Sequence, residues 1–312
     1  MTSTTTLKTA IEDLFGDALT WDDKDTTGYI PCPGREKHSH KDGHKDCRVY
    51  LSGVPTIWCL HNSCEAEVKE ANENLRGALR AQGFEPPPMT AEKRDRQTSK
   101  ANNLRTARRL ADNRDFVFNR FRWDREEIRS EVADLAPSRQ FVSLITGLFG
   151  EDDRLWMGQP FETGDEFKSS FAPSSVWLDR IGCHLGPFIC PNPFAPGTAD
   201  RRAENLSDKR YFVIEGDDCS PDKDENRDRC GAIFKYATGV KPKLKLRAVV
   251  DAGNKSLHGW FEYPGDEIYR WCLDVLPALG ADAATMRLTQ PVRLPGVTRD
   301  NGNQQTLLWI SK

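Results

Sequence analysis

A strongly apolar run that ends in two acidic residues constrains the fold of this chain more than any other feature. Residues 211–214 are Tyr-Phe-Val-Ile, and Glu215 and Asp217 follow with Gly216 between them. Residues two apart share one face of an extended strand, so both carboxylates are expected to point the same way. Carboxylates at the end of a buried strand are costly unless they hold cations. We therefore predict a strand that ends in a Mg²⁺ or Mn²⁺ site, the alternative being a solvated pair of acids.

Two further segments carry side chains suited to a triphosphate. Lys255, Ser256 and His258 follow a glycine-containing turn, where a lysine, a hydroxyl and an imidazole N–H can bind phosphate oxygens. Arg293, followed by Leu-Pro-Gly, would bind the same group with two hydrogen bonds. Asp282 is a third candidate carboxylate, although a helix N-cap is the alternative for it. A buried core histidine is the alternative for His258.

The order and spacing of these segments resemble the archaeo-eukaryotic primase superfamily, in the form that phages and plasmids carry. Its acidic-x-acidic motif resembles Glu215-Gly216-Asp217, and its Gly-Lys-Ser-x-His stretch resembles residues 253–258. Its acidic residue and later Arg-Leu-Pro-Gly resemble Asp282 and residues 293–296. One departure is Asn254, which stands where the family has a second glycine; asparagine tolerates the left-handed turn conformation nearly as well. The resemblance covers residues 188–312.

The resemblance implies an α+β fold with a primase-like catalytic domain, in which an RRM-like sheet has flanking helices. It also implies a DNA primase or primase-polymerase that makes primers on a single-stranded DNA template from nucleoside triphosphates by two-metal nucleotidyl transfer. A separate replicative helicase is an expected partner. In this family the catalytic positions correspond to Glu215, Asp217, Asp282 and His258, with Mg²⁺ or Mn²⁺ on the three carboxylates, and the triphosphate contacts correspond to Lys255, Ser256, His258 and Arg293.

A second constraint is a cluster of cysteines and histidines near the N-terminus. Thiolate and imidazole are the ligands that zinc prefers, and four of them close a tetrahedral structural site. The ligand composition resembles the Cys-His-Cys-Cys zinc ribbon at the front of bacterial and phage primases, although the spacings here are wider. Loose thiols and surface histidines are the alternative. We predict zinc at Cys32, His38, Cys59 and Cys64, with His40, His44, Cys47 and His61 as substitutes for one of them.

Changes in composition along the chain predict three parts. A zinc-binding module spans residues 1–85, a polar linker spans 86–103, and a catalytic domain spans 104–312 and begins with basic helices over 104–136. Apolar periodicity predicts helices near 7–19, 65–82 and 268–279. Short apolar runs predict strands at 141–145, 186–190, 211–214, 246–250, 256–263 and 307–310, with a charged excursion at 221–229.

Charge and composition exclude some classes of protein. A net charge of −3 argues against a chain coated in positive charge, but a local basic stripe suffices for nucleic acid. A solvated helix face is the alternative for that stripe. No apolar run reaches the length of a membrane span, and the N-terminus lacks a signal pattern, so a cytoplasmic protein is expected. The basic stripe comprises Lys93, Arg94, Arg96, Lys100, Arg105, Arg108, Arg109, Arg114, Arg120, Arg122 and Arg125.

Two other functions compete with a primase. A metal-dependent nuclease also uses clustered carboxylates, but it does not explain the side chains suited to a triphosphate. A replication-initiation protein with a catalytically degenerate primase fold would keep DNA binding without synthesis. Incorporation or degradation of labelled DNA, together with nucleotide binding, distinguishes the three.

Overall fold

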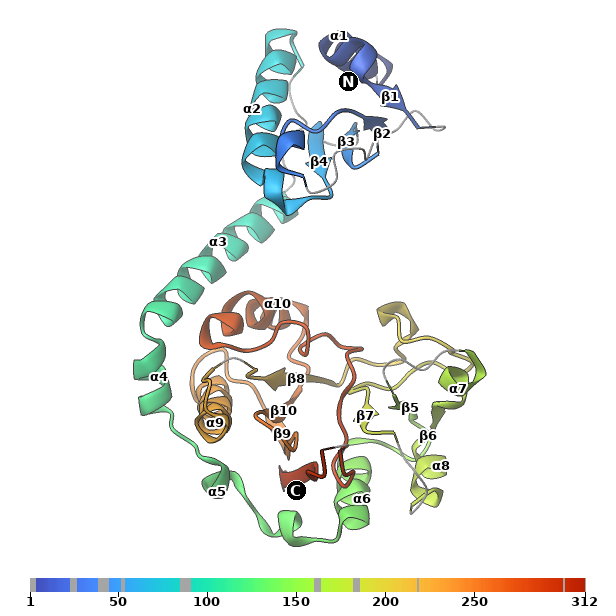
Figure 1. The fold of residues 1–312 in the computed structure, drawn as a ribbon, viewed down its shortest axis with the longest axis vertical. Coiled ribbons are helices and arrows are strands. Elements are labelled where there is room, and N and C mark those ends of the chain that lie inside the picture. The colour runs from blue at the N-terminus through green and yellow to red at the C-terminus, as the bar shows by residue number, and fades with distance from the viewer. Residues whose placement is uncertain are drawn as a thin grey trace. The chain divides into compact units, whose positions relative to one another are not determined.

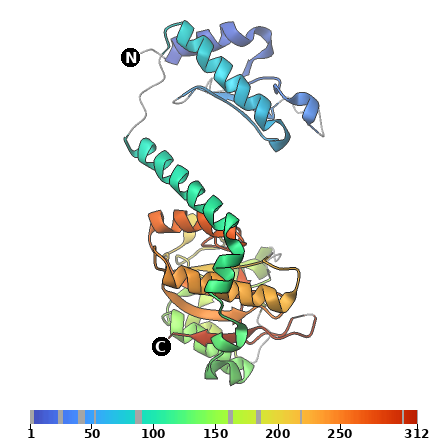
Figure 2. The ribbon, with the colours of Figure 1, turned by 90° about the vertical axis from the view of Figure 1, so that its left-hand side faces the viewer.

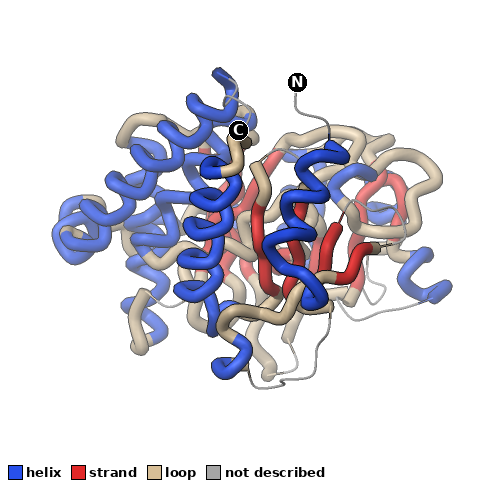
Figure 3. Tube along the Cα trace, turned by 90° about the horizontal axis from the view of Figure 1, so that it is seen from above, coloured by secondary structure: helices blue, strands red, loops and turns tan. Residues whose placement is uncertain are grey.

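The protein is a mixed α+β molecule with three small antiparallel sheets, seen here in a computed structural model (Figures 1 and 3). The structure describes residues 4–22, 27–38, 45–51, 54–84, 91–159, 164–181, 186–217, 219–299 and 301–311. The chain divides into two compact units, an N-terminal unit of Met1–Arg94 and a C-terminal unit of Asp95–Lys312. Among the described residues, no helix combines the length and the apolar character that a membrane span requires.

The N-terminal unit is a four-stranded antiparallel sheet with two helices. Side chains alternate along its strands, so Val49 and Ile57 face a core that also holds Ile11, Leu75 and Leu79. The predicted helices near 7–19 and 65–82 are confirmed. The sheet has the order β1-β2-β3-β4, and the elements are α1 Thr4–Phe15, β1 Thr20–Trp21, β2 Thr27–Tyr29, β3 Cys47–Tyr50, β4 Thr56–Cys59 and α2 Glu65–Ala81, with short 3-10 helices at Gly16–Ala18, Arg35–Lys37 and Asn62–Cys64.

One buried amide ties strand β4 to helix α2. The Asn72 Oδ1 accepts from the Ile57 N–H at 2.8 Å, and its Nδ2 donates to the Ile57 carbonyl at 2.8 Å and to the Val68 carbonyl at 2.9 Å. These bonds satisfy backbone groups at the open edge of β4. They also fix the strand that ends at Cys59 against the helix that follows Cys64.

The larger sheet of the C-terminal unit has the order β12-β9-β10-β8, with all neighbours antiparallel. Strand β10 lies between β8 and β9, and an isolated bridge joins Gly216 to Ala281 just beyond the end of β8. The strands predicted at 211–214, 246–250, 256–263 and 307–310 are confirmed, as is the helix near 268–279. The elements are β8 Tyr211–Glu215, α9 Lys223–Gly239, β9 Leu246–Asp251, β10 Leu257–Glu262, α10 Asp266–Val275, a 3-10 helix Leu276–Leu279 and β12 Thr306–Ile310.

This sheet is buried on both faces. Phe212 and Ile214 point to one face, where they pack with residues of α9 and α10. Tyr211 and Val213 point to the other, where Trp260 and the apolar side of α6 (Pro137–Leu148) lie. Figure 1 shows α9 on one side of the sheet and α6 with strands β5 (Arg154–Gly158) and β7 (Phe188–Ile189) on the other. Glu215 continues the alternation of Tyr211 and Val213, so its carboxylate lies on the second face.

A second sheet of the C-terminal unit has the order β11-β7-β5-β6. Trp156 and Phe171, which lie on two of its strands, form an aromatic cluster with Phe194. The strand predicted at 186–190 is present as β7. The remaining elements are α5 Arg125–Ile128, β5 Arg154–Gly158, α7 Gly164–Ser169, β6 Phe171–Pro173, α8 Ser174–Asp179, β7 Phe188–Ile189 and β11 Val292–Arg293, with 3-10 helices at Glu131–Asp134 and Ala203–Asn205.

One expectation about local structure was wrong, and two segments for which no helix was predicted are helical. The run at 141–145 is part of helix α6, because Phe141, Leu144, Ile145 and Leu148 follow helical spacing and lie on its buried side. The predicted linker is helical from residue 91 as α3, Ala91–Asp112 (Figure 2). Its alanines, arginines and lysines are good helix formers, and the lack of apolar residues indicated only a lack of packing.

The charged excursion at 221–229 contains the start of helix α9. The Asp222 side chain accepts from the Glu225 N–H at 2.8 Å, and this contact caps the first turn. The basic helical segment expected over 104–136 contains the end of α3, then α4 (Arg114–Arg120) and α5.

We expect Gln140→Leu to lower the free energy of unfolding by about 2 kcal/mol. The buried Gln140 amide accepts from the Leu307 N–H at 2.8 Å and donates to the carbonyls of Ala133 and Leu135 at 3.1 and 3.0 Å. Leucine would leave these groups buried without partners. Urea unfolding measures the change, and Thr146→Ala on the exposed side of α6 is the control. Equal midpoints for Gln140→Leu and wild type would contradict this role.

Candidate functional site

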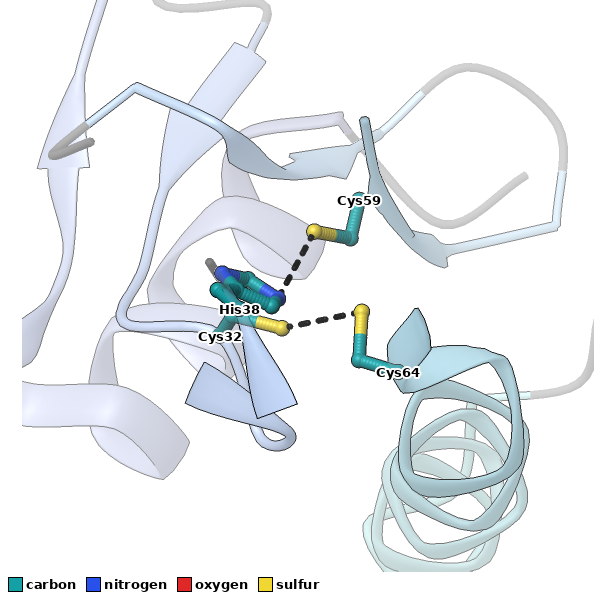
Figure 4. Close-up of side chains that lie close together, drawn as sticks. All are labelled: Cys32, His38, Cys59 and Cys64. Carbon is teal, nitrogen blue, oxygen red and sulfur yellow. Dashed lines mark hydrogen bonds between the residues drawn. The ribbon is translucent and has the colours of Figure 1, made fainter. Parts of the chain in front are cut away.

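The N-terminal unit gathers four metal-binding side chains at one end of its sheet (Figure 4). Cys32 and His38 lie in the connection between β2 and β3, Cys59 ends β4, and Cys64 immediately precedes α2. Their ligand atoms all lie within 4.8 Å of one another. The predicted zinc ligands therefore come together from three places: the β2–β3 connection, the end of β4 and the start of α2.

The distances and donor types fit a tetrahedral zinc ion. The Cys32 and Cys64 sulfurs are 3.5 Å apart, and the Cys59 sulfur is 3.7 Å from the His38 Nε2. Zinc–sulfur bonds of about 2.3 Å in tetrahedral geometry place ligand atoms roughly 3.8 Å apart. Burial, and then the neighbouring Cys32 and Cys59 thiols, raise the pKa of the Cys64 thiol to about 12, so its thiolate form needs a cation. The group could bind a metal such as zinc, with four protein ligands in a closed structural site.

Two of the proposed substitute ligands flank this group. The His61 Nδ1 lies 3.5 Å from the Cys59 sulfur, and its ring stacks on His38 with centroids 4.0 Å apart. Cys47 pairs with Cys59 across β3 and β4 and is buried. The group of four includes neither. The other two substitutes, His40 and His44, lie outside the described residues.

Gly34 allows the turn that carries Cys32 to approach Cys64 closely. A Cβ atom at Gly34 would lie 2.4 Å from the Cys64 Cβ, which is far inside van der Waals contact. The backbone φ of Gly34 is −104°, a value that any residue adopts, so the constraint comes from space alone. The turn that carries Cys32 can therefore pack on the start of α2 only without a side chain at residue 34.

In the C-terminal unit, the predicted catalytic residues meet around the Glu215 carboxylate. Ser256 donates to Oε1 at 2.5 Å, and the His258 Nε2 lies 3.2 Å from the same oxygen. Thr285 donates to Oε2 at 2.9 Å. Burial alone would raise the pKa of Glu215, but His258 and then the two hydroxyls hold it at about 2. Glu215 is therefore a buried anion with donors on both oxygens.

Histidine 258 is held in one orientation from two sides. It lies directly opposite Glu215 in the pairing of β10 with β8 and is buried. Its Nδ1 accepts from the Arg293 backbone N–H at 3.3 Å. Because Nδ1 is an acceptor there, Nε2 carries the proton that faces Glu215. Arg293 thus contacts the site through its backbone, while its guanidinium stacks on the Phe188 ring at 4.1 Å.

A single hydroxyl lies between two carboxylates. The Thr285 Oγ1 is 2.9 Å from the Glu215 carboxylate and 2.8 Å from the Asp282 carboxylate. A hydroxyl has one proton and can donate to only one of them at a time. The Asp282 side chain also accepts from the Ala284 N–H at 2.8 Å, so the turn-capping alternative for this residue is present as well. This shared position has an excess of acceptors, which a cation would satisfy.

Asp217 and Lys255 form a separate pair at the edge of this arrangement. The Lys255 Nζ lies 3.2 Å from the Asp217 Oδ1, and half of the Asp217 side chain is exposed. Within the described residues, the carboxylates of Glu215, Asp217 and Asp282 do not form a second group of three as close as the cysteine and histidine cluster. The structure therefore joins Glu215 and Asp282 through Thr285, and it pairs Asp217 with Lys255.

Sequence reasoning missed three residues that hold these segments in place. Thr285 had no signal of its own. Asn226 is buried and donates to the carbonyls of Gly216 and Lys255 at 2.8 and 2.7 Å. It is the one uncharged residue between Asp222 and Arg229, and this difference from its neighbours is a sequence signal that could have identified it as buried.

The third is Asp251, which is buried at the start of the turn that precedes Lys255. It accepts from the Gly253 N–H at 2.8 Å and pairs with Arg125 at 2.7 Å. Gly253 has φ +72°, and a Cβ there would lie 2.9 Å from the Gln304 carbonyl oxygen. The turn therefore requires glycine at residue 253.

No protein family model matches this chain, and comparisons with curated proteins and with solved structures also gave no match.

We expect Gly34→Ala to weaken zinc binding by about 10-fold or more, because the new methyl group would displace Cys64 from Cys32. Competition with a chelator measures the affinity. Gly77→Ala in α2 is the matched control, since a Cβ there meets no atom within 4 Å. Wild-type zinc affinity in Gly34→Ala would contradict the assignment of this group as a metal site.

Proposed function

We propose that the C-terminal unit is a nucleotidyltransferase that extends a primer or initiating 3′-hydroxyl on single-stranded DNA, as a primase or primase-polymerase of the archaeo-eukaryotic type does. The observation that carries the proposal is the Thr285 hydroxyl between the Glu215 and Asp282 carboxylates, with His258 on the adjacent strand. Paired acidic residues next to donors for phosphate oxygens are the equipment of phosphoryl-group transfer.

The topology of the larger sheet supports the proposal. Its chain order is strand, helix, strand, strand, helix, from β8 to α10, and β10 lies between β8 and β9. The segment after α10 returns to β8 at the Gly216–Ala281 bridge. This is the order of a split β-α-β fold, of which the RRM is one form, with a single bridge in place of its fourth strand. The RRM-like catalytic domain is thus part of the proposal.

Each polar residue has a role that its position suggests. His258 fixes Glu215 through Nε2 and is fixed itself by the Arg293 backbone. Lys255 lies beside the half-exposed Asp217, where an ammonium group can bind a phosphate oxygen. Glu215, Asp217 and Asp282 would hold Mg²⁺ or Mn²⁺, which when bound activates the attacking hydroxyl and neutralises the pyrophosphate that leaves.

One observation favours a second function, a DNA-binding replication protein without catalysis. Both oxygens of Glu215 already have protein donors in Ser256, His258 and Thr285. A carboxylate so fully engaged can have a structural role alone. Zinc-dependent DNA binding without nucleotide binding would favour this second function. A nuclease remains the weaker alternative, because Lys255 and Arg293 suit a triphosphate.

We expect Asp217→Ala to lower primer synthesis on single-stranded DNA by at least about 100-fold. Mutation of a residue that only hydrogen-bonds to a metal ligand costs about 10- to 100-fold in activity, and the loss of a metal ligand itself should cost more. Asp217 is half exposed, so the fold should be unaffected. Synthesis is measured with labelled nucleotides and Mg²⁺ or Mn²⁺. Asp179→Ala, an exposed acid at the end of α8, is the control. Wild-type synthesis by Asp217→Ala would contradict the proposed function.

A further inference from the structure

The outer face of the N-terminal sheet carries a row of side chains that cross all four strands. Thr20, Tyr29, Arg48 and Trp58 lie opposite one another in the pairing of β1, β2, β3 and β4. The next row on the same face comprises Thr27, Tyr50 and Thr56. Residues between these positions point to the opposite face, where the core and the cysteine and histidine group lie.

This outer face exposes aromatic surface. The Trp58 side chain is on the surface and the residue is 45% exposed, whereas its neighbour Ile57 on the inner face is 2% exposed. Tyr29 and Tyr50 are partly exposed. Adjacent strands are about 4.8 Å apart, so Tyr29 and Trp58 stand about 10 Å apart with Arg48 between them. Exposed aromatic clusters of this kind usually mark a surface that binds a partner.

The charge of this face indicates which class of partner it can bind. The Arg48 guanidinium and the Lys45 ammonium both lie over the Tyr29 ring, at 5.8 and 5.7 Å from its centroid. The seven positions of the two rows include one arginine and no acidic residue. Aromatic rings alternating with positively charged side chains suit a ligand that has both planar rings that can stack and negatively charged groups.

We propose that this face, comprising Tyr29, Arg48, Tyr50 and Trp58 with Lys45 beside it, binds single-stranded DNA. The bases stack on Trp58 and Tyr29, and Arg48 and Lys45 contact the phosphates. Duplex DNA hides its base faces within the stack, so it can meet only the two cations. A metal ion bound by Cys32, His38, Cys59 and Cys64 on the other side of the same strands would hold the sheet in shape without taking part in the contact.

This inference rests on the proposed function in one respect: the single-stranded DNA bound by this face would be the template of the proposed enzyme. Binding itself does not need the catalytic site, because the face belongs to the N-terminal unit. The measurement is therefore made without nucleotide, and Asp217→Ala is expected to bind DNA as wild type does. A variant that loses primer synthesis but still binds DNA, or one that loses DNA binding but still synthesises primers, then distinguishes the two proposals.

The test is the fluorescence anisotropy of a short labelled oligothymidylate with the full chain loaded with zinc. We expect Trp58→Ala and Tyr29→Ala each to weaken binding by about 10-fold, and Trp58→Phe to retain most of it, because a ring is kept. We expect Arg48→Ala to reduce the slope of log affinity against log salt by about 0.7. The control is Phe116→Ala, which removes a 63% exposed aromatic residue of the C-terminal unit.

Zinc content measured on each variant shows whether the unit is still folded. Wild-type affinity in Trp58→Ala with full zinc content would overturn the proposal. So would equal affinity for duplex and single-stranded oligonucleotides, since stacking would then contribute nothing. Concentration-dependent dimers that Trp58→Ala abolishes, with unchanged DNA binding, would instead identify the face as a contact between two copies of the chain.

Discussion

The burial of one carboxylate determines how the C-terminal unit is put together. Only 17% of the Glu215 side chain is exposed, and a buried anion is costly unless hydrogen bonds compensate it. Its three donors are Ser256, which immediately precedes β10, His258 within β10, and Thr285 in the segment after α10. These contacts fix the pairing of β10 with β8 and bring Asp282 next to the strand end. The same carboxylate thus organises the local fold and the proposed site.

The N-terminal unit depends on a different constraint. Its sheet has strands of only two to four residues, and a domain this small buries little apolar surface. A metal ion on Cys32, His38, Cys59 and Cys64 would connect the β2–β3 turn, the end of β4 and the start of α2. Asn72 reinforces the same junction through the backbone of Ile57. Metal coordination, together with these hydrogen bonds, would therefore replace part of the missing core.

Much of the fold could be predicted wherever apolar pattern and motif coincided, as in the strand before Glu215 and in the strand that carries His258. The helix α6 was mistaken for a strand because five consecutive residues were considered without the helical spacing that continues to Leu148. Helix α3 was missed because polarity was equated with irregular structure. Thr285 and Asn226 could not be identified from local pattern, since their roles come from contacts across 70 and 29 residues of sequence. Long-range partners of polar groups are settled only by the packed structure.

In the proposed function, Glu215 and its neighbours would form a site for a divalent metal ion and a nucleoside triphosphate. Electron paramagnetic resonance of Mn²⁺ tests it most directly, with and without a nucleoside triphosphate, in wild type and in Glu215→Gln, with thermal unfolding to verify the fold. The account predicts that wild type binds Mn²⁺ together with the nucleotide, and that folded Glu215→Gln loses this binding by at least about 10-fold. Equal Mn²⁺ and nucleotide binding by the two proteins, or none by either, would contradict it.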